Sequence, residues 1–344
     1  MLSRKINLSA FCCYFHCRIS RMKRLFTRQI NFTRQHGNLT FVPHHEAVIE
    51  SQLEKLQMLV DSSTNILILT GAGVSTESGI PDYRSELVGL YARSNHRPIQ
   101  HQDFMRSKHV RQRYWARNFV GWSKFSTVQP NASHFLLASW ERHGKISSIV
   151  TQNVDRLHHK AGSKATVELH GCAHEVKCMK CNYEMSRDKF QSILTELNPS
   201  LSVPNADIRP DADVELSQVE TRKNIIYGYS FFGFTKEIIN TFRVPNCQQC
   251  RDELEGFYKP NIIFFGDNVP KSRVEFVFSQ LQSSDCLIVL GSSLYVYSGY
   301  RFILRASELG IPSAIVNIGP TRGDKLASIK LSAKCSEVLT KICI

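Results

Sequence analysis

Residues 66–75 read Ile66-Leu67-Ile68-Leu69-Thr70-Gly71-Ala72-Gly73-Val74-Ser75, and after three further residues the chain continues as Gly79-Ile80-Pro81-Asp82-Tyr83-Arg84. The four apolar residues lie between a polar stretch and two glycines, which predicts a buried parallel strand that ends in a tight turn. Glycines in such a turn let the backbone come close to a pyrophosphate, whose charge suits free N–H groups at a helix start. Gly79 does not fit the spacing G-x-G-x-x-G, so a plain structural turn is the alternative. The proline, carboxylate, aromatic ring and guanidinium that follow favour a ligand-binding loop.

A second predicted strand, at 146–150, also ends in polar residues. It runs into Thr151-Gln152-Asn153-Val154-Asp155. Side chains at the carboxyl end of a central parallel strand point into the crevice where open α/β sheets bind ligands. The alternative is a turn rich in Asn and Asp that caps the next helix.

One histidine follows a short apolar segment at 167–171, Val-Glu-Leu-His-Gly. A single histidine after a strand is more often a structural residue than a catalyst. The ordinary pKa of an imidazole also suits a general base. The residues alone therefore leave both interpretations of His170 open.

Two cysteine pairs have the spacing of metal-binding knuckles. They are Cys178-Met179-Lys180-Cys181 and Cys247-Gln248-Gln249-Cys250. Two C-x-x-C pairs can complete a closed tetrahedral zinc site that leaves no position for water. About 65 residues separate the pairs, far more than in a zinc ribbon, so two unrelated pairs of thiols are the alternative. Cys172, Cys286 and Cys343 are expected to be buried small apolar residues.

Positive charge is concentrated at the amino terminus. The chain has 43 Lys+Arg against 30 Asp+Glu, and residues 1–45 contain eight Lys or Arg and no acidic residue. This composition is typical of a mitochondrial transit peptide, with Met22 as a possible alternative start. A disordered basic tail that contacts nucleic acid is the alternative. Because only +5 remains on the rest of the chain, we expect no nucleic-acid partner, and the absence of a long apolar run predicts no membrane span.

Taken together, these motifs resemble those of the sirtuins, the NAD-dependent protein-lysine deacylases, and follow the family's order from about residue 66 to 335. The sequence around these motifs is most similar to that of the class II mitochondrial members of animals. The resemblance implies NAD as a co-substrate and one structural Zn²⁺ held by Cys178, Cys181, Cys247 and Cys250. It also implies that His170 is the general base and that Asn153 takes part in catalysis.

The resemblance further implies an NAD-binding set of residues. Gln152 corresponds to a ribose contact, Asn153 and Asp155 to the nicotinamide pocket, and Cys335 to a backbone contact with adenine. The complete predicted set is Gly71, Ala72, Gly73, Ser75, Ile80, Pro81, Asp82, Tyr83, Arg84, Tyr91, Gln152, Asn153, Val154, Asp155, Gly291, Ser292, Ser293, Asn317, Ile318, Gly319 and Cys335.

The expected fold is α/β, a Rossmann-like doubly wound parallel sheet with a smaller inserted zinc-binding domain. The predicted boundaries are 1–45 for the leader, 46–171 and 257–344 for the NAD-binding domain, and 172–256 for the zinc domain. The parallel sheet is expected to resume at 260–267, and 91–127 is expected to be a packed lid or core rather than a nucleic-acid surface. Segment 222–242 is anomalously aromatic for this domain. It is a true insertion, an exposed partner patch or translated intron sequence, and we favour the last.

The implied activity is removal of acyl groups from lysine in mitochondrial matrix proteins, plausible targets being metabolic enzyme complexes. Lipoyl, biotinyl or other bulky groups are expected to be preferred over acetyl. The acyl oxygen attacks C1′ of the nicotinamide ribose, nicotinamide leaves, and His170 activates a ribose hydroxyl, which yields O-acyl-ADP-ribose. Protein mono-ADP-ribosylation shares the first step and is one alternative. A non-catalytic NAD-sensing binding protein is the other.

Overall fold

The computed structural model describes residues 39–93, 98–201, 207–211, 214–215, 236–250 and 256–344. The chain divides into two units, residues 1–37 and 38–344, and all described residues lie in the second. Most of the predicted leader therefore lies outside the described residues. The packed chain begins ahead of the predicted boundary at 45, because the short helix η1 (Leu39–Phe41) places Phe41 in the interior with 5% of its surface exposed.

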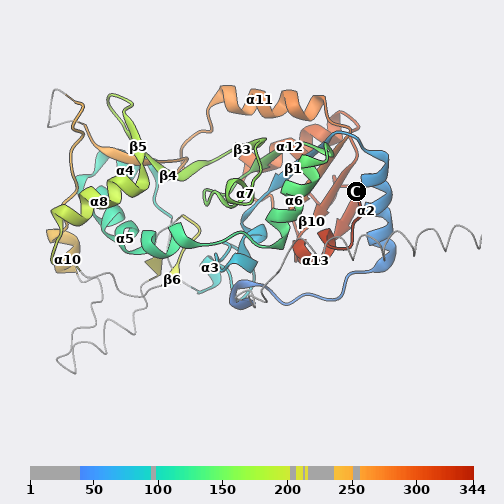
Figure 1. The fold of residues 1–344 in the computed structure, drawn as a ribbon, viewed down its shortest axis with the longest axis horizontal. Helices are drawn as coiled ribbons and strands as arrows, with labels where there is room; N and C mark the ends of the chain where they lie inside the picture. Colours follow the sequence, from blue (N-terminus) through green and yellow to red (C-terminus); the bar gives the residue numbers. More distant parts are fainter. Residues whose placement is uncertain (1–38, 94–97, 202–206, 212–213, 216–235, 251–255) are drawn as a thin grey trace, which may run out of the picture. The chain divides into compact units, whose positions relative to one another are not determined.

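A six-stranded parallel sheet forms the larger part of the fold (Figure 1). Its strand order is β11-β10-β9-β1-β2-β3, which is the order 3-2-1-4-5-6 of dinucleotide-binding sheets. The predicted doubly wound α/β architecture is confirmed. The strands are β1 (Ile66–Thr70), β2 (Ile146–Thr151), β3 (Thr166–Glu168), β9 (Cys286–Leu290), β10 (Ser313–Val316) and β11 (Ile329–Leu331).

Both faces of this sheet are covered by helices because its central strands are apolar on both sides. In β1, Ile66 and Ile68 belong to one core cluster, whereas Leu67 and Leu69 belong to the other. The first face is covered by α2 (Glu50–Ser62), α6 (Ala132–Arg142) and α13 (Cys335–Leu339), and the second by α11 (Lys271–Gln282) and α12 (Tyr297–Glu308). Short elements connect them: η2 (Ala72–Val74), η3 (Thr76–Ser78), α3 (Leu90–Arg93) and α7 (Leu157–Lys160).

A second, three-stranded antiparallel sheet has the order β5-β4-β8. Its strands are β4 (Gly171–Cys178), β5 (Glu184–Ser186) and β8 (Tyr258–Ile262). The prediction that the parallel sheet resumes at 260–267 is wrong, because β8 pairs with β4 and the parallel sheet resumes only at β9. A buried apolar run does not reveal its partner strand. Pro260, which cannot donate to a ladder, fits the edge position that β8 occupies.

Helices α4 (His101–Arg106), α5 (Lys108–Thr127), α8 (Arg187–Leu197) and α10 (Lys236–Thr241) gather around β4 and β5, at the far end of the fold from the parallel sheet (Figure 1). Trp115 of α5 packs on Phe190 of α8 with ring centroids 4.6 Å apart. The buried guanidinium of Arg187 donates to Asn118 Oδ1 at 2.8 Å and lies over the Trp122 ring. The expectation that 91–127 is packed is confirmed for α5, whose contacts lie with the three-stranded sheet. Two short paired strands of two residues each also contact α5. They are β6 (Asp207–Ile208) and β7 (Val214–Glu215).

The anomalous segment 222–242 is only partly described. Residues 222–235 lie outside the described residues, so its origin stays a prediction. Residues 236–242 include α10, and Phe242 is buried with its ring centroid 5.6 Å from that of Phe119. Gln112 also donates a hydrogen bond to the Phe242 carbonyl at 2.8 Å. Among the described residues, no helix is both long and apolar enough to cross a bilayer.

Two buried histidines lie behind the nucleotide-type turn. The ring centroids of His134 and His158 are 4.9 Å apart, and His158 Nε2 lies 3.0 Å from Thr70 Oγ1 at the end of β1. His134 also closes the capping box of α6, since its Nδ1 accepts from the Asn131 backbone N–H. Burial lowers the pKa of His158 to about 3, with a further contribution from His159, and lowers that of His134 well below 6.5.

We expect acid to unfold the protein through this pair. In the unfolded chain His158 is protonated below about pH 6.5, whereas in the folded protein it is protonated only below about pH 3. The stability that the neutral His158 contributes is therefore lost as the pH falls from 6.5 towards 3. One such histidine lowers the free energy of unfolding by about 2 kcal/mol between pH 7.5 and 5. Urea titrations at both pH values are expected to show a shallower pH dependence for His158→Gln than for wild type. The exposed His143→Gln is the control, and an unchanged pH dependence in His158→Gln would contradict the assignment.

Candidate active site

A cavity of about 1820 Å³ lies at the carboxyl ends of the parallel strands. It brings together nineteen of the residues predicted from the sequence, from six separate turns of the chain. They are Gly71, Ala72, Gly73, Ser75, Ile80, Asp82, Tyr83, Arg84, Gln152, Asn153, Val154, Asp155, His170, Gly291, Ser292, Ser293, Asn317, Ile318 and Gly319. Pro81, Tyr91 and Cys335 do not line it.

Two of these three residues, Cys335 and Tyr91, lie close by. Cys335 starts α13 and lines a small adjoining hollow together with Gly73 and Asn317. Tyr91 packs on Tyr83 with ring centroids 5.8 Å apart, and the Arg84 guanidinium lies 5.5 Å from its ring centroid. Tyr91 therefore supports two cavity-lining side chains from behind.

The first glycine turn is in direct contact with the turn after β9. Gly71 N–H donates to the Leu290 carbonyl at 3.0 Å, and Gly73 N–H donates to the Gly291 carbonyl at 2.8 Å. A Cβ on Gly71 would lie 2.7 Å from Ser292 Cβ, and one on Gly73 would lie 2.9 Å from Gly291 Cα. The two glycines are required here by this close approach, since φ of Gly71 is −129° and open to any residue. The contact lies between β1 and β9, where the strand order reverses and open α/β sheets bind ligands.

The turn after β2 is tied to the first turn by buried hydrogen bonds. Asn153 Nδ2 donates to the Gly71 carbonyl at 3.0 Å and lies 3.1 Å from Ser75 Oγ. Ser75 Oγ donates to Asp155 Oδ2 at 2.7 Å, and the other oxygen of Asp155 accepts from the Leu157 N–H at 2.9 Å. Burial raises the pKa of Asp155, and these hydrogen bonds partly offset that shift. Asp155 thus both lines the cavity and accepts a hydrogen bond from the first residue of α7.

His170 lies two residues beyond β3 with both ring nitrogens engaged. Nδ1 is 2.9 Å from the Gln152 carbonyl oxygen, and Nε2 is 2.8 Å from Ser298 Oγ. A carbonyl can only accept, so Nδ1 carries the proton and Nε2 presents its lone pair. Burial lowers the pKa of His170 to about 4, and Arg273 and Arg301 act in the same direction, although the Gln152 carbonyl opposes them. The imidazole is therefore neutral near pH 7, as a general base must be.

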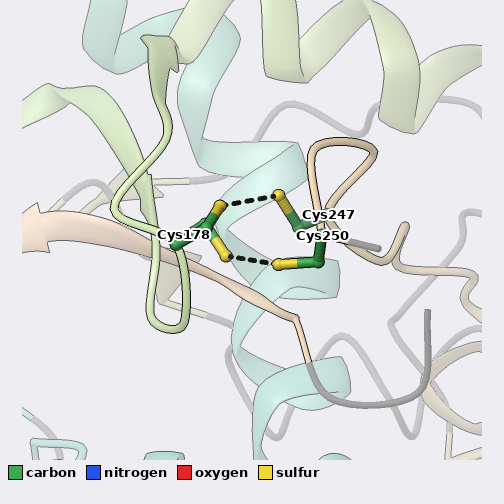
Figure 2. A group of neighbouring side chains, drawn as sticks. Cys178, Cys247 and Cys250 are labelled. Atoms are coloured by element: carbon green, nitrogen blue, oxygen red, sulfur yellow. Dashed lines mark hydrogen bonds between the residues drawn. The ribbon is translucent and has the colours of Figure 1, made fainter. Parts of the chain in front are cut away.

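The four predicted metal ligands converge on one point (Figure 2). Their sulfur atoms lie within 4.8 Å of one another, and the Cys178–Cys250 and Cys181–Cys247 pairs are each 3.6 Å apart. A tetrahedral zinc with Zn–S bonds of about 2.3 Å places its sulfurs about 3.8 Å apart, so the donor set and its geometry fit Zn²⁺. A Cβ on Gly256 would lie 2.4 Å from Cys250 Sγ, which explains the glycine beside the cluster. Of the other three cysteines considered, Cys172 and Cys286 are buried as expected, but Cys343 is exposed.

Several cavity-lining residues were not anticipated from the sequence. Pro210 and Asp211, between β6 and β7, reach the cavity, and the charge of Asp211 helps burial to raise the pKa of Tyr83. Ser298 and Arg301 enter from the first turns of α12. Segment 43–49, just before α2, forms another part of the wall. No spacing or composition signal connects these residues with the glycine turns, because their approach depends on the fold.

The chain belongs to the Sir2 family, whose sequence profile matches residues 71–298. It is 52% identical to the NAD-dependent protein deacylase Sirt4 of Drosophila melanogaster, over 88% of this chain and 90% of that protein. It is 49% identical to the NAD-dependent protein lipoamidase sirtuin-4, mitochondrial, of Homo sapiens, over 88% and 89%. A solved Sir2 structure with a p53 peptide and NAD⁺ superimposes with a TM-score of 0.60 at 27% identity, covering 84% of this chain and 96% of that one. Enzymes of this family use NAD as a co-substrate.

Loss of one cysteine ligand is expected to remove the metal. Cys178→Ser should lose about one zinc per chain and loosen the three-stranded sheet, because a closed four-thiolate site contributes its binding energy to folding. Zinc content by mass spectrometry and melting temperature check this. Cys343→Ser, which changes an exposed cysteine, is the matched control. A full zinc content in Cys178→Ser would refute the shared site.

Gly71→Ala is expected to force the two contacting turns apart. A new Cβ meets Ser292 Cβ and the Gly291 carbonyl, which are fixed parts of a packed turn rather than a flexible tip. Such overpacking costs about 1–3 kcal/mol, and separation of the turns should weaken NAD binding at least tenfold. Urea unfolding and NAD titration calorimetry measure the two effects. Wild-type affinity for NAD in this variant would show that the close approach is not needed for binding.

Proposed function

We propose that this protein is an NAD-dependent protein-lysine deacylase that prefers lipoyl, biotinyl or other bulky acyl groups to acetyl. The observation that carries the proposal is the position of His170. Its neutral imidazole lines the same cavity as the glycine turns, with Nδ1 fixed by a backbone carbonyl and the Nε2 lone pair accepting the hydroxyl of Ser298. The names of the two sirtuin-4 relatives, deacylase and lipoamidase, support the acyl preference.

In this proposal the contacting turns hold the dinucleotide. The pyrophosphate lies at the N–H groups after Gly71, and the adenosine end lies toward 317–319 and the start of α13. Gln152 contacts ribose, while Asn153 and Asp155 form the nicotinamide pocket. Asn153 is positioned for this by its hydrogen bond to the Gly71 carbonyl, which couples the pocket directly to the phosphate-binding turn.

The acyl oxygen of the lysine substrate attacks C1′ of the nicotinamide ribose, and nicotinamide leaves. This forms an imidate, and a ribose hydroxyl attacks the imidate carbon as His170 removes its proton. The lysine amine then leaves, and water from the solvent adds to the cyclic intermediate that remains, which gives O-acyl-ADP-ribose. Because burial lowers the pKa of His170 to about 4, the ring is unprotonated over the whole physiological pH range and its Nε2 lone pair can accept a proton. The same loss of nicotinamide would precede ADP-ribose transfer to a protein, so the product identifies which nucleophile takes C1′.

The zinc cluster has a structural role in this proposal. Four thiolates leave no coordination position for substrate, so the metal joins β4 to the chain that returns before β8. We propose 46–171 and 257–344 as the NAD-binding domain and 172–256 as the zinc domain. By their contacts, α5 and β8 extend the packing of the zinc domain beyond those limits.

The substrates in this proposal are acylated proteins of the mitochondrial matrix, plausibly metabolic enzyme complexes. Relatives from Bos taurus and Homo sapiens carry the word mitochondrial in their names. The basic, acid-free residues 1–45 fit a mitochondrial import signal.

A panel of acyl peptides tests the function. Wild type is expected to release nicotinamide faster with lipoyl and biotinyl peptides than with acetyl peptides, and mass spectrometry should detect O-acyl-ADP-ribose. His170→Ala is expected to lower deacylation by about 10²- to 10⁴-fold, the usual contribution of a general base. His109→Ala, an exposed histidine of α5, is the control.

Each other outcome changes the conclusion in a defined way. ADP-ribosylated protein without O-acyl-ADP-ribose would replace the deacylase by the transferase. NAD binding without release of nicotinamide from NAD in the presence of any of the peptides would leave only an NAD-sensing binding protein.

A further inference from the structure

The hydroxyl of Ser298 is hydrogen-bonded to Nε2 of His170, the ring nitrogen that carries no proton. Ser298 Oγ is 2.8 Å from His170 Nε2, and both residues line the cavity. Because Nδ1 carries the ring proton, Nε2 has no hydrogen to give. Ser298 must therefore donate its own proton to Nε2.

Gln152 fixes this pair in place. Its backbone carbonyl accepts from His170 Nδ1, and its side chain donates to Ser292 Oγ at 2.8 Å. The same side chain packs on Gly299, where an added Cβ would lie 2.6 Å from Gln152 Oε1. Ser298 precedes that glycine in the first turn of α12, so Gln152 is in contact with both the ring and the serine's neighbour.

The bond to Nε2 leaves the two lone pairs of Ser298 Oγ open to a further donor. Among the described residues, the only hydrogen-bond partner of this hydroxyl is His170. Because Ser298 engages the single lone pair of Nε2, a ribose hydroxyl can donate to Ser298 Oγ but not to Nε2 in this arrangement. Direct transfer to His170 would require the serine to rotate away first.

We propose that Ser298 relays the proton between the ribose hydroxyl and His170, an inference that rests on the proposed deacylase function. The ribose O–H bond breaks and its proton goes to Ser298 Oγ, while the original Ser298 proton goes to Nε2. Serine is regenerated as a neutral hydroxyl, and His170 becomes an imidazolium stabilised by the Gln152 carbonyl. The ribose oxygen forms its bond to the imidate carbon as the π electron pair of the C=N bond moves to nitrogen. Two protons move, and no other reactant is required.

Ser298→Ala tests the relay in single-turnover reactions with a lipoyl peptide. Formation of O-acyl-ADP-ribose is expected to fall by about tenfold or more. Exchange of labelled nicotinamide into NAD, which reports only the first step, should fall much less. In mixtures of H₂O and D₂O, the rate of wild type should depend on deuterium fraction with the curvature of two transferred protons, and that of Ser298→Ala should be linear.

Two further variants control for structural effects. Ser298→Thr keeps the hydroxyl and is expected to restore most of the rate. Ser307→Ala removes an exposed hydroxyl from the same helix and should match wild type. Melting temperatures of all variants are compared.

The relay is overturned by a linear isotope dependence in wild type, by the same curvature in Ser298→Ala as in wild type, or by unimpaired product formation in Ser298→Ala. It is also overturned if a stably folded Ser298→Thr is as slow as Ser298→Ala, or if nicotinamide exchange falls in parallel with product formation. These results leave the deacylase function standing when wild type is active and His170→Ala is not. A wild type without turnover overturns the function and the relay together.

Discussion

The contact between the two glycine-containing turns is the constraint on which the rest of the site depends. Gly71 and Gly73 lie against Gly291 and Ser292 at the point where the strand order reverses. Backbone hydrogen bonds between these turns fix both exits, so neither can move without the other. The side chain of Asn153 then attaches the third exit, after β2, to the same point. One backbone-to-backbone approach therefore aligns the ends of three adjacent strands, and polar side chains from all three can face a single ligand.

The electrostatics of the cavity separate the roles of its ionisable groups. The carboxylate of Asp155 accepts hydrogen bonds from a serine hydroxyl and a backbone N–H, and these bonds hold it in the wall of the cavity. Glu168, two residues before His170, has Arg156 Nε at 3.4 Å and His159 Nδ1 at 3.7 Å. The two partners that hold the His170 ring are a carbonyl and a hydroxyl, both uncharged. No carboxylate among the described residues hydrogen-bonds this ring, so burial, together with Arg273 and Arg301, lowers its pKa and keeps it neutral.

How much of this could be predicted from sequence depended on the range of the interaction. Strands such as β1 and β9 were predictable because four or five consecutive apolar residues followed by glycine encode them locally, and the order of the motifs placed their exits together. The partner of β8 could not be predicted, since Pro260 indicates an edge strand but not the sheet to which that strand belongs. The location of α5 depends on Trp115 meeting Phe190, a contact between segments far apart in the chain. Ser298 lay outside every motif, because its importance arises only when α12 brings it to His170.

The zinc cluster closes an excursion of about 65 residues between its two cysteine pairs. The entropic free-energy cost of closing such a loop rises slowly with its length, by about 0.6 kcal/mol for each doubling. Material can therefore be added or removed between the pairs at little thermodynamic cost. This segment is therefore one in which related enzymes can evolve different recognition surfaces while they keep the same chemistry.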